Sequence, residues 1–277
     1  MRHIQPAGGV RYVDAWPARL AITVRGEGEA VICIPSLGRG GGDFDDLAGR
    51  LAEAGFRAIT FDPRGFGKST GKLDVAGLGD FAADVAAIIE RTGAAPAHVV
   101  GHAFGNRVAR YLAWRRPELV RSLTLLACGG QVAGDAEAQR ALNDTFRLDL
   151  PAEEHLRAVQ TAFFAAGHDA SVWREGWSVN VARSQRGAIE ATGHGDWQFP
   201  WDVPILIVQG LDDRIAPPAN GRILKLRLGD AVTLVELAEM GHAILPEQPE
   251  RIAAEVVGFL RTTGGKVQDE RGTAGGA

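Results

Sequence analysis

VVGHAFGN, residues 99–106, is the stretch that decides the fold of this chain. Its valines end an apolar run with the length of a buried strand, and a helix is expected to follow from residue 104. Gly101 and Gly105 lie on either side of the junction, where they permit a sharp turn and close packing of strand against helix. The stretch therefore predicts a strand, a tight turn and a helix, with the side chain of Ala103 exposed at the turn.

Predicted strands alternate with predicted helices on both sides of this turn. Strands are expected at 19–25, 30–34, 57–61, 97–101, 121–127, 203–209 and 231–237. Helices are expected at 44–54, 78–91, 104–115, 217–227 and 247–262, the first of them capped by Asp43. This alternation predicts an α/β fold with a mostly parallel central sheet and helices on both of its faces.

Residues 131–200 interrupt the alternation. They contain no run with the pattern of a buried strand, but they contain helical patterns at 136–147 and 153–165. We therefore expect a helical cap inserted over the carboxyl edge of the sheet, where α/β folds bind ligands. The α/β core then comprises residues 1–130 and 201–262. The last segment, 263–277, is rich in glycine and charged residues and predicts a flexible tail.

The composition narrows the class of protein. Charged residues make up 23% and hydrophobic residues 45% of the 277, as in soluble proteins with a sizeable core, and the net charge of −4 offers no basic face for nucleic acid or an anionic membrane. The N-terminus lacks the apolar core of a signal peptide, and no apolar run is long enough to span a bilayer, so we expect a cytoplasmic enzyme. Cys33 and Cys128 are isolated, which predicts buried thiols and no metal site. Composition does not indicate the oligomeric state.

Three further loops follow predicted strands and contain chemically useful residues. Residues 34–42 read IPSLGRGGG, residues 210–217 read GLDDRIAP, and Gly241-His242 precedes the last predicted helix. Residues 34–42 resemble the oxyanion loop of the α/β-hydrolase family, and residues 99–106 resemble its Gly-x-Ser-x-Gly nucleophile elbow. Residues 210–217 resemble its acid loop, and Gly241-His242 resembles its histidine loop. The four segments follow the family's order along the chain. Residues 62–69, DPRGFGKS, match a further loop of the family. The resemblance covers roughly residues 20–130 and 200–262.

The resemblance implies a role for each of these loops. Asp213, four residues before a proline, takes the place of the catalytic acid in preference to Asp212, and His242 takes that of the general base. The backbone amides of Leu37 and Phe104 take the place of the oxyanion hole. The family needs no cofactor or metal for this chemistry. Pro-Ser at residues 35–36 departs from the His-Gly that is usual there.

Ala103 stands where the family has its nucleophilic serine, and a methyl group cannot attack a carbonyl carbon. Two explanations keep the chain an enzyme. In the first, which we favour, a working serine was replaced to trap a bound molecule; in the second, the alanine is native and His242 with Asp213 acts as a general-base dyad. A third possibility is a ligand-binding protein with no chemistry. Retention of both acid and base favours an enzyme over a pure binding protein.

The expected substrate is a small to medium, largely apolar ester or lactone. Its pocket is expected to involve side chains of the cap and the oxyanion loop, namely Ser36, Arg39, Trp173, Trp177, His194 and Trp197. The tryptophans have the alternative of forming the cap's own core. Arg39 either meets a substrate carboxylate or is solvated, and we favour the second. Ser36 is a poor nucleophile because it lies off the line of attack, and His102 is expected to be packed.

Overall fold

The computed structural model describes residues 9–199 and 203–264. The start of the predicted core, the predicted junction at 200–202 and residues 265–277 of the predicted tail lie outside the described residues. Helix α9 extends through Gly264, and the hydroxyl of the buried Thr263 donates a hydrogen bond to the carbonyl oxygen of Leu260 at 3.1 Å. The first two residues of the predicted tail are therefore helical.

The predicted α/β class is confirmed by a single mixed sheet in the described residues. The strands are β1 (Arg11–Ala15), β2 (Ala18–Arg25), β3 (Ala30–Ile34), β4 (Arg57–Phe61), β5 (Ala97–His102), β6 (Val120–Leu126), β7 (Ile205–Gly210) and β8 (Val232–Leu237). Their order across the sheet is β1-β2-β4-β3-β5-β6-β7-β8. All pairs from β4 to β8 are parallel, whereas β1, β2 and β4 pair antiparallel. The sequence prediction omitted β1, which forms the edge of the sheet.

Helices cover both faces of the sheet, as the sequence predicts. The helices are α1 (Asp45–Glu53), α2 (Leu78–Arg91), α3 (Phe104–Arg115), α4 (Ala136–Asp144), α5 (Ala152–Phe163), α6 (Val179–Thr192), α7 (Ala219–Leu228), α8 (Ile244–Glu247) and α9 (Pro249–Gly264). Along β3, Ile32 and Ile34 pack with α2 and α3, while Val31 and Cys33 pack with α1 and α9. This alternation explains why a strand buried on both faces reads as a continuous apolar run.

The start of α1 differs from the prediction. A 3₁₀ turn, η1 (Gly41–Phe44), precedes the helix, and the N-cap residue is Phe44. Asp43 does not cap the helix because its carboxylate is bound to the guanidinium of Arg39, with Nη2 to Oδ1 at 2.6 Å. None of the helices in the described ranges is long and apolar enough to cross a membrane.

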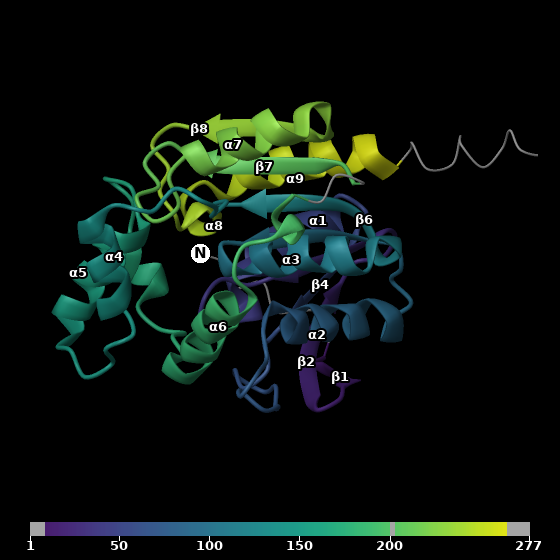
Figure 1. Cartoon of the computed structure of the whole chain (residues 1–277), viewed down its shortest axis with the longest axis horizontal. Helices are drawn as coiled ribbons and strands as arrows, with labels where there is room; N and C mark the ends of the chain where they lie inside the picture. Colours follow the sequence, from purple (N-terminus) through teal and green to yellow (C-terminus); the bar gives the residue numbers. More distant parts are fainter. Residues whose placement is uncertain (1–8, 200–202, 265–277) are drawn as a thin grey trace, which may run out of the picture.

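A helical insertion connects β6 to β7. We use this name for residues 131–199, which contain α4, α5, α6 and the 3₁₀ turns η3 (Ala170–Trp173) and η4 (Asp196–Gln198). Figure 1 shows α4, α5 and α6 on the side of the molecule toward which the strand arrows point. The insertion therefore lies at the carboxyl edge of the sheet, which is where the sequence predicts a cap.

The turn between β5 and α3 brings the helix into direct backbone contact with its neighbours. A Cβ atom added at Gly105 would collide with the carbonyl oxygen of Ile34, at the end of β3. One added at Gly101 would lie 2.5 Å from the carbonyl carbon of Gly105. Only glycine permits both approaches, which place the first turn of α3 against the end of β3.

We expect Gly105→Ala to lower the free energy of unfolding by about 1–3 kcal/mol, since the new methyl group overpacks a contact made of backbone atoms. Gly187→Ala is the matched control, because a Cβ atom there meets no other group within 4 Å in the middle of α6. It should leave stability unchanged or raise it by up to about 1 kcal/mol. Urea unfolding of both variants tests this, and equal stabilities would contradict the packing argument.

Candidate active site

His242 and Asp213 are buried and hydrogen-bonded to each other at the carboxyl edge of the sheet. Asp213 lies in the loop after β7, and His242 lies in the loop after β8. His242 Nδ1 and Asp213 Oδ2 are 2.9 Å apart, and both side chains are almost completely buried. Because a carboxylate can only accept, Nδ1 of the neutral ring carries the proton and Nε2 keeps its lone pair. His242 lines a cavity, so this nitrogen is available as a base.

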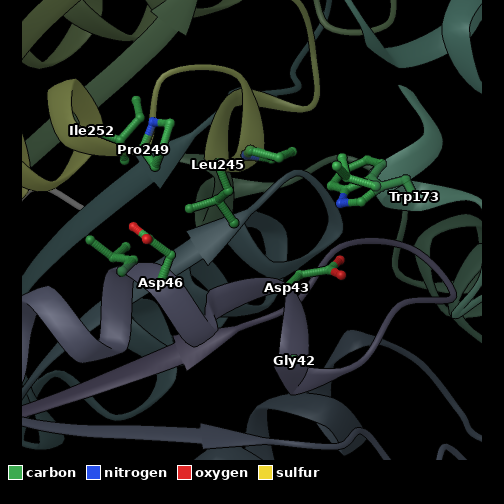
Figure 2. A pocket seen from close by; sticks show the side chains of 10 residues that line it. Gly42, Asp43, Asp46, Trp173, Leu245, Pro249 and Ile252 are labelled. Carbon is green, nitrogen blue, oxygen red and sulfur yellow. The ribbon is translucent and has the colours of Figure 1, made fainter. Parts of the chain in front are cut away.

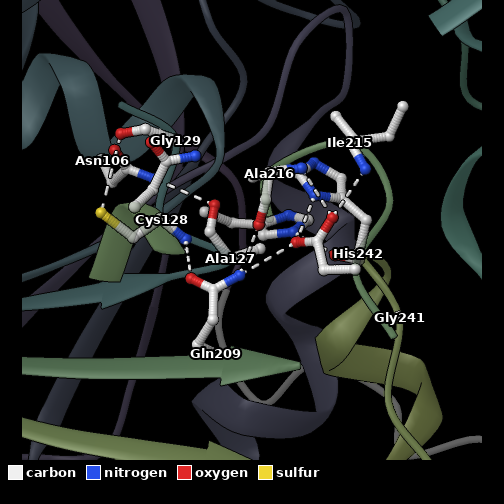
Figure 3. Close-up of polar contacts among 12 residues, drawn as sticks. Asn106, Ala127, Cys128, Gly129, Gln209, Ile215, Ala216, Gly241 and His242 are labelled. Atoms are coloured by element: carbon white, nitrogen blue, oxygen red, sulfur yellow. Dashed lines mark hydrogen bonds and ion pairs between the residues drawn. The ribbon is translucent and has the colours of Figure 1, made fainter. Parts of the chain in front are cut away.

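The carboxylate of Asp213 is held by donors from its own loop and from β7. Its Oδ1 accepts from the amides of Ile215 at 2.9 Å and Ala216 at 2.7 Å. Oδ2, which faces His242, also accepts from Nε2 of Gln209 at 3.2 Å. The same Gln209 accepts from the amide of Cys128 through its Oε1, at 2.9 Å (Figure 3). These bonds fix the orientation of the acid, because nearly every lone pair of its carboxylate is used.

The helical insertion holds the loop that carries His242. The carbonyl oxygen of Phe163, at the end of α5, accepts from the amides of His242 at 2.7 Å and Ala243 at 2.8 Å. The buried carboxylate of Glu247 accepts from the amide of Gly241 at 2.9 Å and from that of Ala165 at 2.7 Å. Burial raises the pKa of Glu247, which the two amide donors oppose. The position of His242 thus depends on residues of α5 and α8 as well as on β8.

Ala103 retains a strained backbone at the sharp turn. It has φ 48° and ψ −103°, a conformation that non-glycine residues rarely adopt. The amide of Phe104 is the first of helix α3, and it donates to no group of the described residues; the same holds for the amide of Leu37. Residues 37, 103 and 104 line the same cavity as His242. The turn therefore presents the methyl group of Ala103 to the cavity, near two uncommitted donors.

The cavity beside His242 has a volume of about 260 Å³. Most of its wall is apolar, with two arginines and a few uncharged polar groups. Its lining consists of Ser36, Leu37, Ala103, Phe104, Arg107, Ala127, Gly129, Gln139, Leu142, Phe163, Arg186, Ile189, Ile215, Ala216 and His242. The sequence-predicted residues 36, 37, 103, 104 and 242 therefore meet here, and Asp213 lies behind the histidine.

The other predicted pocket residues lie elsewhere. Trp173 packs in the core of the helical insertion, and the indole of the half-buried Trp177 donates to the carbonyl oxygen of Trp173 at 2.8 Å. Trp197 packs against Tyr111 in the main core, and His194 contacts Gln198 at 3.3 Å. None of these four lines the cavity beside His242. Trp173 and Trp177 thus follow the alternative expected for them, as core residues of the cap, whereas Trp197 belongs to the main core.

Arg39 is neither solvated nor directed at the cavity. Its guanidinium is buried, pairs with Asp43 and donates to the carbonyl oxygen of Glu175 at 2.7 Å. It also lies between the rings of Trp173 and Trp177, 4.7 and 4.5 Å from their centroids. The favoured expectation of a solvated side chain is therefore wrong, because Arg39 fastens η1 to the helical insertion.

A second cavity, of about 250 Å³, lies between η1, α1, η3 and the start of α9. Figure 2 shows Trp173 and Leu245 among the side chains that line it, with Asp43 and Asp46. Both carboxylates are already paired, Asp43 with Arg39 and Asp46 with Arg50. This second cavity contains neither His242 nor Ala103, so we assign the chemistry to the first.

Sequence reasoning missed four residues that shape the site: Gln209, Glu247, Arg107 and Arg186. Gln209 had one usable signal, since it is a polar residue at the end of an apolar strand directly before the acid loop. Glu247 and the two arginines read as ordinary charged residues of helices, and nothing in their sequence context marks them as buried or as lining a cavity.

Comparison with known proteins identifies the family of the chain. The model of the α/β hydrolase fold family matches residues 29–165. Rhodomycin D methylesterase DauP of Streptomyces sp. (strain C5) is 28% identical over 256 residues, covering 78% of this chain and 85% of DauP. RutD of Variovorax paradoxus (strain S110), provisionally named a carbamate hydrolase, is 30% identical over 230 residues, covering 78% of this chain and 86% of RutD.

A solved structure shows the same fold. The crystal structure of BpoC from Mycobacterium tuberculosis H37Rv, provisionally named a non-heme bromoperoxidase, matches with a TM-score of 0.75 and 26% identity. The match covers 88% of this chain and 96% of BpoC. The chain therefore belongs to the α/β-hydrolase fold family, as its loops suggest, and its relatives there include esterases.

His102 is a buried structural partner of the loop that carries His242. Its Nε2 donates to the carbonyl oxygen of His242 at 2.9 Å, which links the end of β5 to the loop after β8. Complete burial, reinforced by the nearby ring of His242, lowers the pKa of His102 to about 3. The folded chain thus resists protonation of a ring that in the unfolded chain has a pKa of about 6.5.

We expect His102 to make the protein acid-sensitive. The contribution of the neutral His102 ring to the free energy of unfolding is fully present above a pH of about 6.5. It is lost as the pH falls toward about 3, because only the unfolded chain takes up the proton in this window. His102→Gln should show a smaller fall in the free energy of unfolding between pH 7 and pH 4. A part of the slope should persist, since burial also lowers the pKa of His98. Urea unfolding at both pH values tests this; an unchanged slope would contradict it.

Proposed function

We propose that this site is built to hydrolyse an ester or lactone of a small substrate and that Ala103 replaces the nucleophilic serine. One observation carries the proposal: the base His242, oriented by Asp213 at 2.9 Å, shares a cavity with the strained residue 103 and two uncommitted amides. Base, orienting acid and oxyanion donors are the parts that serine hydrolysis requires besides the nucleophile.

The chemistry follows from the positions of these groups. With a serine at position 103, the hydroxyl oxygen would attack the carbonyl carbon while His242 Nε2 takes its proton. The amides of Leu37 and Phe104 would donate to the oxyanion, and the helix start at Phe104 adds a favourable dipole. His242 would then give the proton to the leaving alcohol, and water would repeat the sequence on the acyl group. Asp213 would stabilise the protonated ring throughout.

The size of the cavity and the names of relatives support a small ester. About 260 Å³ is at the lower end of the range for ligand pockets, which fits a compact substrate. DauP is named a methylesterase, and RutD is provisionally named for carbamate hydrolysis. Both names describe cleavage at an acyl carbon. Dehalogenation and epoxide opening use a carboxylate at the turn, for which residue 103 offers no basis.

A second candidate is an enzyme in which the alanine is native. It is favoured by the geometry of His242, whose basic Nε2 faces a cavity while Nδ1 is fixed by Asp213. Such a dyad would abstract a proton from a substrate or activate a water without forming an acyl-enzyme.

We expect Ala103→Ser to raise kcat on short 4-nitrophenyl esters by on the order of 10⁶, which is what a nucleophile in such a unit contributes. The assay compares 4-nitrophenyl butyrate and a small lactone with both forms of the chain. Ala103→Gly, which supplies no hydroxyl, is the matched control and should stay inactive. No gain with serine in a folded protein would count against the proposal.

In the serine form we expect Asp213→Asn to lower kcat by about 10⁴, since an amide can hold the histidine in the wrong tautomer. Burst kinetics should then show a slower acylation step. If the serine form and its Asp213→Asn variant have equal kcat, Asp213 does not orient the base.

The dyad predicts a different result with the alanine chain itself. If the dyad is the catalytic unit, the alanine chain should turn over a substrate slowly, and His242→Ala should abolish that turnover. Steady-state assays of the unmodified chain at high concentration test this. A ligand that is bound tightly and recovered unchanged, with the serine form also inert, would instead identify a binding protein.

A further inference from the structure

We infer that the substrate of this site carries a carboxylate besides its ester or lactone bond, and that Arg107 and Arg186 bind it. The inference rests on the proposed function and refines its substrate class. It starts from the charges that line the cavity, which are those of two arginines and of no aspartate or glutamate.

Arg107 lies one helical turn beyond Ala103 on α3. This spacing of four residues places its side chain above the turn, on the same side of the helix. The half-buried guanidinium lies against the backbone after β6, because a Cβ atom added at Gly129 would lie 3.3 Å from its Nη2. Arg107 makes no hydrogen bond or ion pair within the described residues, although it lines the cavity.

Arg186 reaches the same cavity from the helical insertion. It lies on α6, and its guanidinium stacks over the ring of Phe146, 5.1 Å from the centroid. Its Nη2 is completely buried and has no hydrogen-bond partner among the described residues. The other two guanidinium nitrogens also form no hydrogen bond within the described residues, and Arg186 lines the cavity. A carboxylate in the cavity would therefore meet a guanidinium group that lacks an acceptor.

Two other buried arginines of this chain, Arg39 and Arg64, have carboxylate partners. Arg64 pairs with Asp84 at 2.7 Å, with both side chains buried, and Arg39 pairs with Asp43. Arg107 and Arg186, which line the cavity that contains His242, have no hydrogen-bond acceptor among the described residues. The contrast indicates that their acceptor comes with the ligand.

A third arginine reinforces the positive potential below the cavity. Arg110 is fully buried on the next turn of α3, where uncharged oxygens satisfy it: the Gly129 carbonyl at 2.9 Å and the Asn106 amide oxygen at 3.1 Å. Its charge adds to burial in lowering the pKa of Arg107 to about 10, so Arg107 remains protonated at neutral pH. The carboxylate of Asp213 forms no ion pair with these arginines; it accepts hydrogen bonds from His242, Gln209 and loop amides instead.

The ligand class follows from charge, volume and the apolar wall. Guanidinium groups bind carboxylates with charge-assisted, often bidentate hydrogen bonds. A volume of about 260 Å³, walled by Leu142, Ile189 and Ile215, leaves room for a short hydrocarbon segment between the two functional groups. A monoester of an aliphatic dicarboxylic acid combines these properties, and it serves as the probe.

The kinetic test uses the serine form and two matched esters. Mono-4-nitrophenyl adipate carries a free carboxylate, and its methyl ester has the same chain without the charge. We expect kcat/KM to be at least tenfold higher for the anion. Arg107→Gln and Arg186→Gln should each lower the ratio of the two values by about 10- to 100-fold, and Arg107→Lys should restore part of it.

Controls on the same two helices separate a local effect from a change in total charge. Arg115→Gln on α3 and Arg183→Gln on α6 remove exposed arginines that do not line the cavity. They should keep the ratio of the parent. If Arg107→Gln does not fold, Arg186→Gln carries the test, and thermal unfolding of each variant identifies this case. Equal ratios in the parent and both cavity variants would overturn the inference.

A binding measurement makes the inference independent of catalysis. Calorimetry with the unmodified Ala103 chain compares monomethyl adipate with dimethyl adipate. We expect at least tenfold tighter binding of the monoanion, lost in the double Gln variant. If the serine form is inactive on every ester but this preference is found, the proposed function fails and the anion site stands. If the serine form hydrolyses both esters without preference and binding is equal, the anion site fails and the proposed function stands.

Discussion

The site depends on the close contact between the first turn of α3 and the end of β3. Gly105 makes this contact possible, since any side chain there would strike the carbonyl oxygen of Ile34. The contact holds Ala103 in a backbone conformation that its own side chain disfavours. The amide of Phe104 and the guanidinium of Arg107 are then placed by helical geometry alone. The surrounding packing, rather than the chemistry of residue 103, therefore maintains the turn.

The charged groups of the site differ in how many hydrogen-bond partners they have: the acid Asp213 has several, and the two cavity arginines have none among the described residues. Asp213 is one of the best satisfied carboxylates in the described chain, with amides on one oxygen and His242 with Gln209 on the other. The arginines of the cavity, by contrast, have donors to spare. In a chain of net charge −4, this local excess of positive charge concentrates anions at one place.

Much of the fold and the central pair were predictable from sequence. Period and composition located the strands from 19–25 to 231–237, and the order of the loops singled out Asp213 and His242, which lie in contact. Buried parallel strands and glycine-bracketed turns are local signals. The edge strand β1 was missed because it is short and half exposed, so its pattern is weak.

The walls of the cavity were not predictable, for a physical reason. Which side of a loop or helix faces the cavity depends on how the helical insertion packs on the sheet. The spacing of residues in the sequence does not specify this packing. Arg39 was assigned to solvent, yet two tryptophan rings and Asp43 enclose it. Arg107 and Arg186, which do reach the cavity, are indistinguishable in sequence from exposed helical arginines.

The hydrogen bonds of the helical insertion connect two loops of the cavity through one part of the chain. Gln185, in the middle of α6, accepts from the amide of Gly38 at 2.7 Å, and the amide of Ser178, the N-cap of α6, donates to the carbonyl oxygen of Gly38 at 2.9 Å. Gly38 is the residue after Leu37. The end of α5 binds the amide of His242. Lifting the insertion from the sheet would therefore break the supports of both loops at once. The backbone beside Leu37 and the position of His242 thus depend on contacts with the same insertion, so a change in how the insertion packs would alter both walls of the cavity together.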